Sequence, residues 1–428
     1  MEGTSSKSQR PQDTGARRKR VAIVLSGGGS RGAYEAGVLS WMFENIYPKL
    51  RPDFEFDIIS GTSVGAIHAS YVACSSGMKP VDRARTLVET WQNMRFDNVL
   101  QLTWRDFVGI PLRSLGLGVP RVRGSGSDGV ALGGLVDIAP LENLVRTRIP
   151  WHRLRANLAA GRPSVLCTAV TEVNSGVVRI FLDGPGADTS AWDHDLHVDA
   201  VATRITDLHV RASAAIPFLF PAVRIDGRYY VDGGLRLNTP LSPAVRLHAD
   251  KVFVIGLKKR MSKHDKVEFS NVQALTQPAF LLGKLLDVML LDPIENELRQ
   301  LEIVNALLQG GKESFGDDFI ERIEPILRQV RGVGYQPIEF FMQNPSQDIG
   351  QIAAECYQGS NGAAGMPGVL AALIKRTATM GVPKNEADFL SYIYFDRAFT
   401  DRLVDLGRED AKASGDRILE LLTTDDGN

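Results

Sequence analysis

A serine between two glycines is the first candidate for chemistry in this 428-residue chain. Ser63 lies in the pentapeptide Gly61-Thr62-Ser63-Val64-Gly65, between the apolar run FDIIS and a segment with helical composition. This order predicts a strand, a tight turn and a helix over residues 56–70. Such a turn exposes the serine at the end of its strand, and small residues two positions before and after let strand and helix pack closely. The helix N-terminus favours an oxyanion there, so we interpret Ser63 as a nucleophile; an idle serine in a glycine-rich turn is the alternative.

A second glycine-rich turn follows the all-apolar run of residues 21–26 and consists of Gly27, Gly28, Gly29, Ser30, Arg31 and Gly32. Backbone N–H groups in such a turn, next to a helix N-terminus, form an anion site. The anion could be the oxyanion of an acyl-transfer intermediate. It could also be a dinucleotide pyrophosphate, because GGGSRG satisfies GxGxxG. A dinucleotide site expects an acidic residue at the end of the next strand, whereas Asp57 is at its beginning, so we favour the oxyanion hole.

An aspartate is the third candidate. The Asp226-Gly227 pair predicts a β-hairpin within residues 222–241, and its second strand ends at Asp232, followed by Gly233 and Gly234. A carboxylate at a strand end can take the proton of a serine hydroxyl, and the two glycines let another backbone approach. The alternative is an aspartate that only binds its own turn.

The elements that carry these residues alternate between strands and helices. Two consecutive strand-turn-helix units in a mostly parallel sheet bring both turns to the carboxyl edge, so the glycine-rich turn should face Ser63. Further strands are predicted in SVLCTAVTE and GVVRIFLD, which form a pair, in KVFVIGL and in QPIEFFMQNPS. Helices are predicted over residues 81–94, 206–215 and in the closing segment 363–424.

We predict three regions along the chain. Residues 1–20 form a disordered basic tail, residues 21–260 the catalytic core, and residues 261–428 a mainly helical region packed on that core. The core contains an irregular insertion at 100–134, interpreted as either a substrate-side flap or a floppy insertion. An apolar stripe over residues 272–331 is interpreted as core packing. An interfacial membrane helix is the alternative, and acidic residues in that stripe count against it.

Composition excludes several function classes. With 49 basic and 50 acidic residues the net charge is −1, so no overall field recruits nucleic acid. The three cysteines match no metal spacing, no calcium loop is recognisable, and we expect no cofactor or metal. Neither a signal peptide nor a transmembrane helix is predicted, so the expected location is cytoplasmic or peripheral to a membrane. The oligomeric state is open.

Four blocks, GGGSRG, GTSVG, RASAAIPFLFPAV and DGGLRLNTP, follow one another in the chain. In order and rough spacing they resemble the signature blocks of the patatin-like phospholipase family, and the likeness to bacterial-type members covers roughly residues 20–415. The resemblance implies a three-layer α/β/α fold with a mostly parallel central sheet and a helical C-terminal extension. It implies a dyad without histidine, with Ser63 as nucleophile, Asp232 as base and an oxyanion hole in the glycine-rich turn.

The implied activity is hydrolysis of fatty-acyl esters of phospholipids or other acyl lipids through an acyl-enzyme, with peripheral membrane contact. Four alternatives stay open. A Ser-Asp-His triad could use His248 or His264, although neither lies in a turn motif, and His68 is expected to be packed or solvent-facing. The same dyad could transfer the acyl group to another acceptor. The chain could instead be a nucleotide-binding oxidoreductase using GGGSRG, or an inactive lipid-binding scaffold.

Overall fold

The computed structural model describes residues 18–95, 123–124, 130–131, 139–217, 220–235, 241–260, 292–359 and 387–423. Most of the predicted basic tail and most of the predicted insertion at 100–134 lie outside these residues. The described part of the insertion is an antiparallel pair of two-residue strands, β3 (Arg123–Gly124) and β4 (Val130–Ala131). The residues 272–291, 363–386 and 424 of the predicted helical segments also lie outside the described parts.

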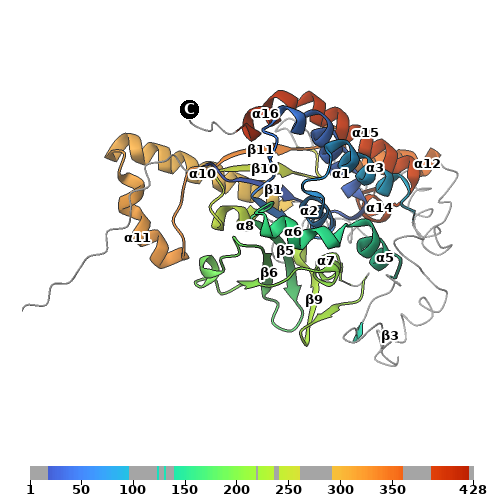
Figure 1. The fold of residues 1–428 in the computed structure, drawn as a ribbon, viewed down its shortest axis with the longest axis horizontal. Coiled ribbons are helices and arrows are strands. Elements are labelled where there is room, and N and C mark those ends of the chain that lie inside the picture. The colour runs from blue at the N-terminus through green and yellow to red at the C-terminus, as the bar shows by residue number, and fades with distance from the viewer. Residues whose placement is uncertain are drawn as a thin grey trace, which may run out of the picture.

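A nine-stranded, mostly parallel sheet forms the centre of the molecule (Figure 1). Its order is β11-β10-β1-β2-β5-β6-β7, with β9 paired to β5 and β8 to β9. The five strands from β11 to β5 run parallel, whereas β6 and β9 run antiparallel to β5. The strands are β1 (Val21–Leu25), β2 (Ile58–Gly61), β5 (Val165–Glu172), β6 (Val178–Asp183), β7 (Val198–Ala202), β8 (Val223–Ile225), β9 (Arg228–Asp232), β10 (Lys251–Ile255) and β11 (Glu339–Gln343).

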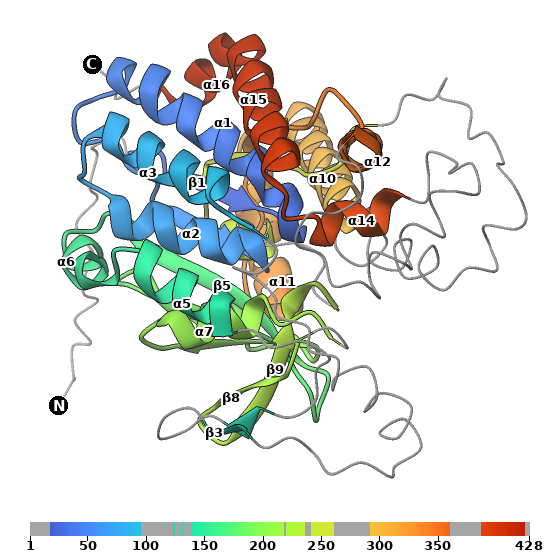
Figure 2. The same ribbon diagram turned by 90° about the vertical axis from the view of Figure 1, so that its right-hand side faces the viewer.

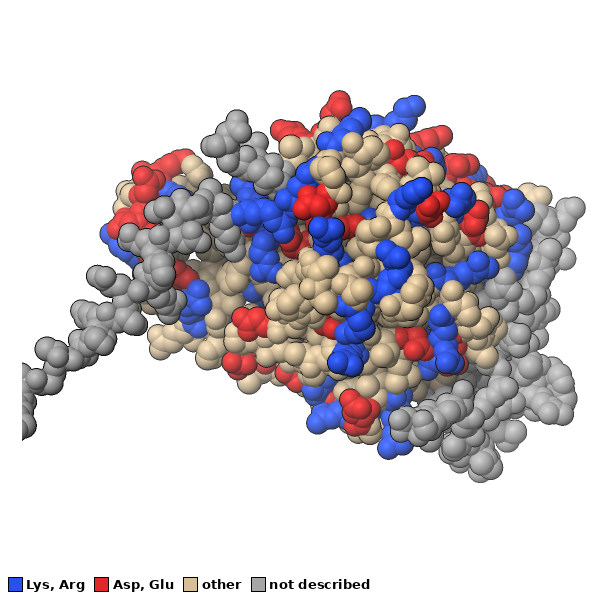
Figure 3. Space-filling view, in the orientation of Figure 1, with Lys and Arg blue, Asp and Glu red and all other residues tan. Residues whose placement is uncertain are grey.

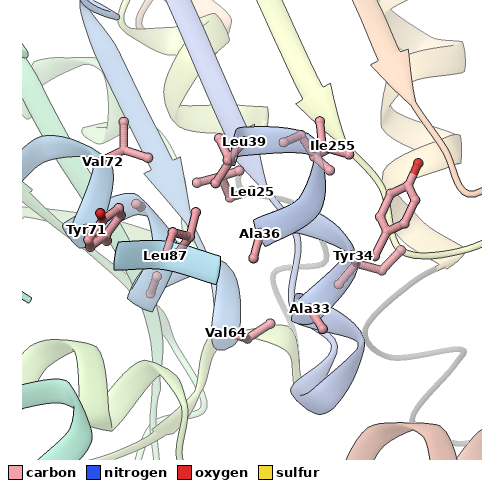
Figure 4. Close-up of a cluster of buried hydrophobic side chains, with 14 of the residues drawn as sticks. Leu25, Ala33, Tyr34, Ala36, Leu39, Val64, Tyr71, Val72, Leu87 and Ile255 are labelled. Atoms are coloured by element: carbon pink, nitrogen blue, oxygen red, sulfur yellow. The ribbon is translucent and has the colours of Figure 1, made fainter. Parts of the chain in front are cut away.

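The central strands are apolar throughout because helices cover both faces of the sheet. Side chains alternate between the faces, so Ile23 of β1 joins one core and Val24 joins the other. Figure 4 shows part of the first core, where Leu25 and Ile255 from the sheet lie near Ala36 and Leu39 from α1 (Gly32–Asn45). This arrangement confirms the predicted three-layer α/β/α fold.

In the described part of the chain, ten α-helices contribute apolar side chains to the first core, and Figure 2 shows several of them side by side. They are α1 (Gly32–Asn45), α2 (Val64–Ser75), α3 (Pro80–Gln92), α5 (Ala139–Arg148), α6 (Leu154–Ala159), α7 (Asp207–Ser213), α12 (Ile349–Gly359), α14 (Ala387–Ile393), α15 (Arg397–Ala413) and α16 (Gly415–Leu422). On the opposite face, α8 (Leu241–Arg246) and α10 (Asp292–Phe315) pack on the second core. The predicted helices at 81–94 and 206–215 correspond to α3 and α7.

The C-terminal part of the chain is built into the core structure. Strand β11 extends the sheet by pairing with β10, and α15 packs along α1. The two helices touch at Gly37 and Gly407, where a Cβ on either glycine would overlap a backbone carbonyl of the other helix. The sheet therefore continues beyond residue 260, because β11 belongs to it. The division of the chain into two regions at residue 260 stays a prediction.

The apolar stripe predicted at 272–331 is described from α10 onward. Ile294, Leu298 and Leu301 of α10 pack on the second core, whereas α11 (Phe319–Arg331) has no fully buried residue and projects with the end of α10 to the left of Figure 1. Across the described ranges, every helix is too short or too polar to cross a bilayer. On the face drawn in Figure 3, basic and acidic side chains are interspersed.

Candidate active site

Ser63 occupies the sharp turn between β2 and α2, as predicted. Its backbone has φ 57° and ψ −127°, a region that costs a residue with a side chain about 1–3 kcal/mol. Both flanking positions must be glycine because the backbone packs too closely for a side chain. A Cβ on Gly61 would overlap the carbonyl oxygen of Gly65, and a Cβ on Gly65 would overlap the carbonyl oxygen of Leu25. The strained turn thus places Ser63 at the carboxyl edge of the sheet, between β1 and β5.

Helix α7 and the residues after it hold both predicted dyad members in place. The Ser63 N–H donates to Ser213 Oγ at 3.0 Å, and that hydroxyl donates to the Ala169 carbonyl of β5 at 2.7 Å. Two residues further on, the Ala215 carbonyl accepts the N–H of Asp232 at 2.9 Å. In the sequence the block RASAA stands out only as part of a resemblance, and the structure gives its serine a specific contact with the Ser63 turn.

Asp232 ends β9 and is almost completely buried. Its Oδ1 accepts the Gly234 N–H at 2.8 Å, while Oδ2 is buried without a partner among the described residues. Burial raises the pKa of Asp232 from 3.8 to about 6, and interactions with the Ser63 side chain and the Gly234 N–H oppose that rise. Gly233 lies against the Ala169 carbonyl, where a Cβ would not fit. The raised pKa makes the Asp232 carboxylate a stronger base than an ordinary aspartate. It lies next to Ser63, and its Oδ2 has no partner among the described residues.

The glycine-rich turn follows β1 and faces the same edge of the sheet. Within it, the N–H of Arg31 donates to the Gly28 carbonyl and that of Gly32 to the Gly29 carbonyl, so these two amides are occupied. The amides of Gly27, Gly28, Gly29 and Ser30 form no hydrogen bond to another described residue. These four N–H groups are the candidates for oxyanion donors within the six predicted residues.

Residues from α14, more than 350 positions away, brace this turn. Ser30 Oγ donates to the Ser391 carbonyl at 2.7 Å, and the buried Arg31 donates through Nε to Ser391 Oγ at 2.7 Å. The Arg31 guanidinium also stacks on the Tyr392 ring at 4.2 Å from its centre. Gly29 has φ +57°, and a Cβ there would overlap the Tyr392 carbonyl oxygen. Sequence reasoning missed Ser391 and Tyr392, because no local motif marks them.

An apolar cavity opens beside Ser63. Its walls are mostly apolar side chains from α2, α3, α5, α14 and the residues that follow α7. Gly29 and Ser63 line one end, and Leu87, Leu141 and Ile393 are among the apolar residues of the wall. The apolar lining suits a hydrocarbon chain with its polar end at Ser63.

The histidines do not complete a triad in the described part of the chain. His248 precedes β10, at the amino edge of the parallel sheet, so the length of a five-residue strand, about 16 Å, separates it from the edge that carries Ser63. His68 is buried and bonded to Glu35 and Trp91. His264 lies outside the described residues. Within the described ranges no cluster of His, Cys, Asp and Glu resembles a metal site.

Comparison with known proteins identifies the family. The model of the patatin-like phospholipase family matches residues 23–245, more than half of the chain. The protein therefore belongs to the patatin-like phospholipase family, as the four sequence blocks predicted. The matched region contains Ser63, Asp232 and the glycine-rich turn, but not α14.

Individual relatives are distant. The uncharacterized protein YjjU of Escherichia coli (strain K12) is 30% identical over 240 residues, which are 55% of this chain and 51% of that protein. The uncharacterized protein L620 of Acanthamoeba polyphaga mimivirus is 39% identical over 80 residues, 18% of this chain and 20% of that protein. The chain thus spans about half or less of these relatives. VipD from Legionella pneumophila is 14% identical with a TM-score of 0.29, covering 91% of this chain and 67% of that one.

Proposed function

We propose that this protein hydrolyses fatty-acyl esters of phospholipids through an acyl-enzyme on Ser63, with Asp232 as the base. One observation carries the proposal. A serine on a strained turn stands beside a buried carboxylate whose second oxygen is unoccupied among the described residues, and the serine lines an apolar cavity.

In the first half of the reaction, Asp232 takes the proton of the Ser63 hydroxyl while Oγ attacks the ester carbonyl. Unbonded amides of the glycine-rich turn, among those of Gly27, Gly28, Gly29 and Ser30, donate to the oxyanion of the tetrahedral intermediate. When the intermediate collapses, the protonated Asp232 gives its proton to the departing alcohol, which is the lysophospholipid. The fatty-acyl group remains on Ser63 with its chain in the cavity.

In the second half, a water molecule replaces the alcohol. Asp232 takes a proton from the water, whose oxygen attacks the acyl carbonyl, and the same amides hold the second oxyanion. Collapse releases the fatty acid and returns the proton to Ser63. Acyl transfer to an acceptor other than water would use the same steps, with the acceptor hydroxyl in place of water.

The test is fatty-acid release from phosphatidylcholine vesicles and hydrolysis of a short-chain aryl ester. We expect Ser63→Ala and Asp232→Asn to reduce kcat by at least about 10³-fold on both substrates while remaining folded. The matched control for the serine is Ser70→Ala. Ser70 is buried on α2, the helix that begins directly after Ser63. Its hydroxyl has no hydrogen-bond partner among the described residues, so this variant should keep wild-type activity.

Activity of Ser63→Ala within tenfold of wild type would eliminate the proposed nucleophile. Activity of the wild type on the aryl ester but not on vesicles would limit the proposal to the chemistry and remove bilayer phospholipid as the substrate. If fatty acid appears as an ester of an added alcohol in preference to free acid, the enzyme is an acyltransferase.

A further inference from the structure

A second buried carboxylate lies behind the glycine-rich turn and takes no part in the proposed dyad. Glu35, in the first turn of α1, is completely buried. Its Oε1 accepts the Ser26 N–H at 2.7 Å, and its Oε2 lies 2.6 Å from His68 Nδ1. Burial raises the pKa of Glu35, and the contacts with His68 and Ser26 oppose that effect.

The proton arrangement around Glu35 follows from a third side chain. Trp91 Nε1 lies 2.9 Å from His68 Nε2. An indole nitrogen can only donate, so Nε2 of His68 accepts and the ring proton of the neutral imidazole sits on Nδ1. His68 therefore donates to Glu35, which uses one oxygen for His68 and the other for Ser26. Only a carboxylate offers acceptors to both donors.

The three residues join elements that carry different parts of the proposed chemistry. Ser26 directly precedes the glycine-rich turn, and its hydroxyl donates to the Ile255 carbonyl at 2.7 Å. His68 lies on α2, the helix that begins immediately after Ser63, and Trp91 lies on α3. The chain of contacts from Ser26 through Glu35 to His68 thus spans the gap between the turn and the nucleophile helix.

We propose that Glu35 is a positioning residue for the acyl-transfer reaction: it fixes the start of the glycine-rich turn relative to α2, so that the unbonded amides of the turn point at the oxyanion formed on Ser63. This inference rests on the proposed hydrolysis. Glu35 touches neither substrate nor Ser63. Since an oxyanion donor acts on the transition state and not on substrate binding, loss of Glu35 should lower kcat and leave KM unchanged.

The experiment exploits the proton arrangement. In Glu35→Gln the amide offers one acceptor to two donors, because Trp91 prevents His68 from moving its proton to Nε2. If Trp91→Phe is added, Nε2 can carry the proton, and Nδ1 can then accept from the glutamine amide while its oxygen keeps Ser26. The effect of Glu35→Gln should therefore depend on whether the indole N–H is present.

We expect Glu35→Gln alone to lower kcat for the aryl ester about 10–100-fold, less than a whole oxyanion donor is worth. When Trp91→Phe is the parent enzyme, the same change should lower kcat less than threefold. KM should stay within twofold in each comparison. Asp57→Asn is the matched control, since Asp57 is also a buried carboxylate that accepts a backbone N–H of β1, at Val21, but at the opposite edge of the sheet. It should lower the unfolding temperature and keep kcat within twofold.

Three results would overturn the inference. The first is a folded Glu35→Gln enzyme with wild-type kcat. The second is an equal loss of kcat with and without Trp91→Phe, and the third is a loss of kcat in Asp57→Asn as large as in Glu35→Gln. If Glu35→Gln does not fold, Glu35→Asp replaces it, because the shorter acid keeps its charge but cannot reach both donors; unchanged kcat there overturns the inference as well. A wild type without any esterase activity would instead remove the proposed function, and this inference with it.

Discussion

The buried carboxylate of Asp232 must be ionised before it can take a proton from Ser63, and burial makes that ionisation unfavourable. With a pKa of about 6, Asp232 is largely protonated at pH 5. We therefore expect kcat/KM for the aryl ester to fall about tenfold per unit below pH 6 and to level off above pH 7. A pH profile that is flat from 5 to 8 would contradict this role of Asp232.

The same shift predicts that the base destabilises the fold. The folded-state pKa of about 6 lies above the ordinary value of 3.8, so ionisation costs stability; the penalty is absent below pH 4, grows up to about pH 6 and is constant above it. Asp232→Asn removes the charge and keeps an oxygen for the Gly234 N–H. We expect this variant to raise the free energy of unfolding at pH 8 by up to about 3 kcal/mol, because one pKa unit corresponds to about 1.4 kcal/mol.

Urea unfolding of Asp232→Asn and wild type at pH 8 and pH 4 measures this difference. The gain should disappear at pH 4, where the folded wild type also carries a proton on Asp232. A variant that is less stable than wild type at pH 8 would show that the carboxylate is compensated by a partner outside the described residues.

At the scale of elements, α14 and the glycine-rich turn form one unit. Ser391→Ala removes the Oγ that accepts from Arg31 Nε and leaves that buried donor without this partner. We expect a loss of about 1–3 kcal/mol in the free energy of unfolding. We also expect a fall in kcat with little change in KM, because the turn that carries the proposed oxyanion donors loses part of its support. Unchanged stability and kcat would show that the Ser391 carbonyl and Tyr392 suffice.

Sequence could predict these elements only where the signal is local. The glycine spacing around Ser63 and the apolar runs of β1 and β10 report the geometry of their own neighbourhood, and the predicted turn, strands and dyad positions follow from them. The contact of Ser30 with Ser391 joins residues 361 positions apart, and no pattern near either residue marks it.

Glu35 and His68 were also missed as a pair, since a buried polar residue in a helix looks the same in sequence as an exposed one. Strand β7 was missed because none of its side chains is fully buried, and the apolar alternation is weak.

At the scale of the whole molecule, charge gives little help in reaching a membrane. The net charge is −1, and the face in Figure 3 shows both signs intermixed. We expect hydrolysis of vesicles containing about 20% anionic lipid to change less than about threefold between roughly 50 and 500 mM NaCl, because screening removes only electrostatic attraction. A tenfold loss at high salt would point to a basic contact, for which the double variant Arg17→Ser, Lys19→Ser in the basic tail is the direct test.

The brace between the glycine-rich turn and α14 also has a consequence for synthesis on the ribosome. Ser63 leaves the ribosome 329 residues before Tyr392 does, which at about 5–20 residues per second is about 15 to 65 seconds. During that interval the nascent chain lacks the residues that support its proposed oxyanion donors, so it should be unable to attack lipids near the translating ribosome. Ribosome-bound chains stalled at increasing lengths should react with a fluorophosphonate probe only once α14 has emerged, and labelling of a chain that ends before α14 would contradict this order.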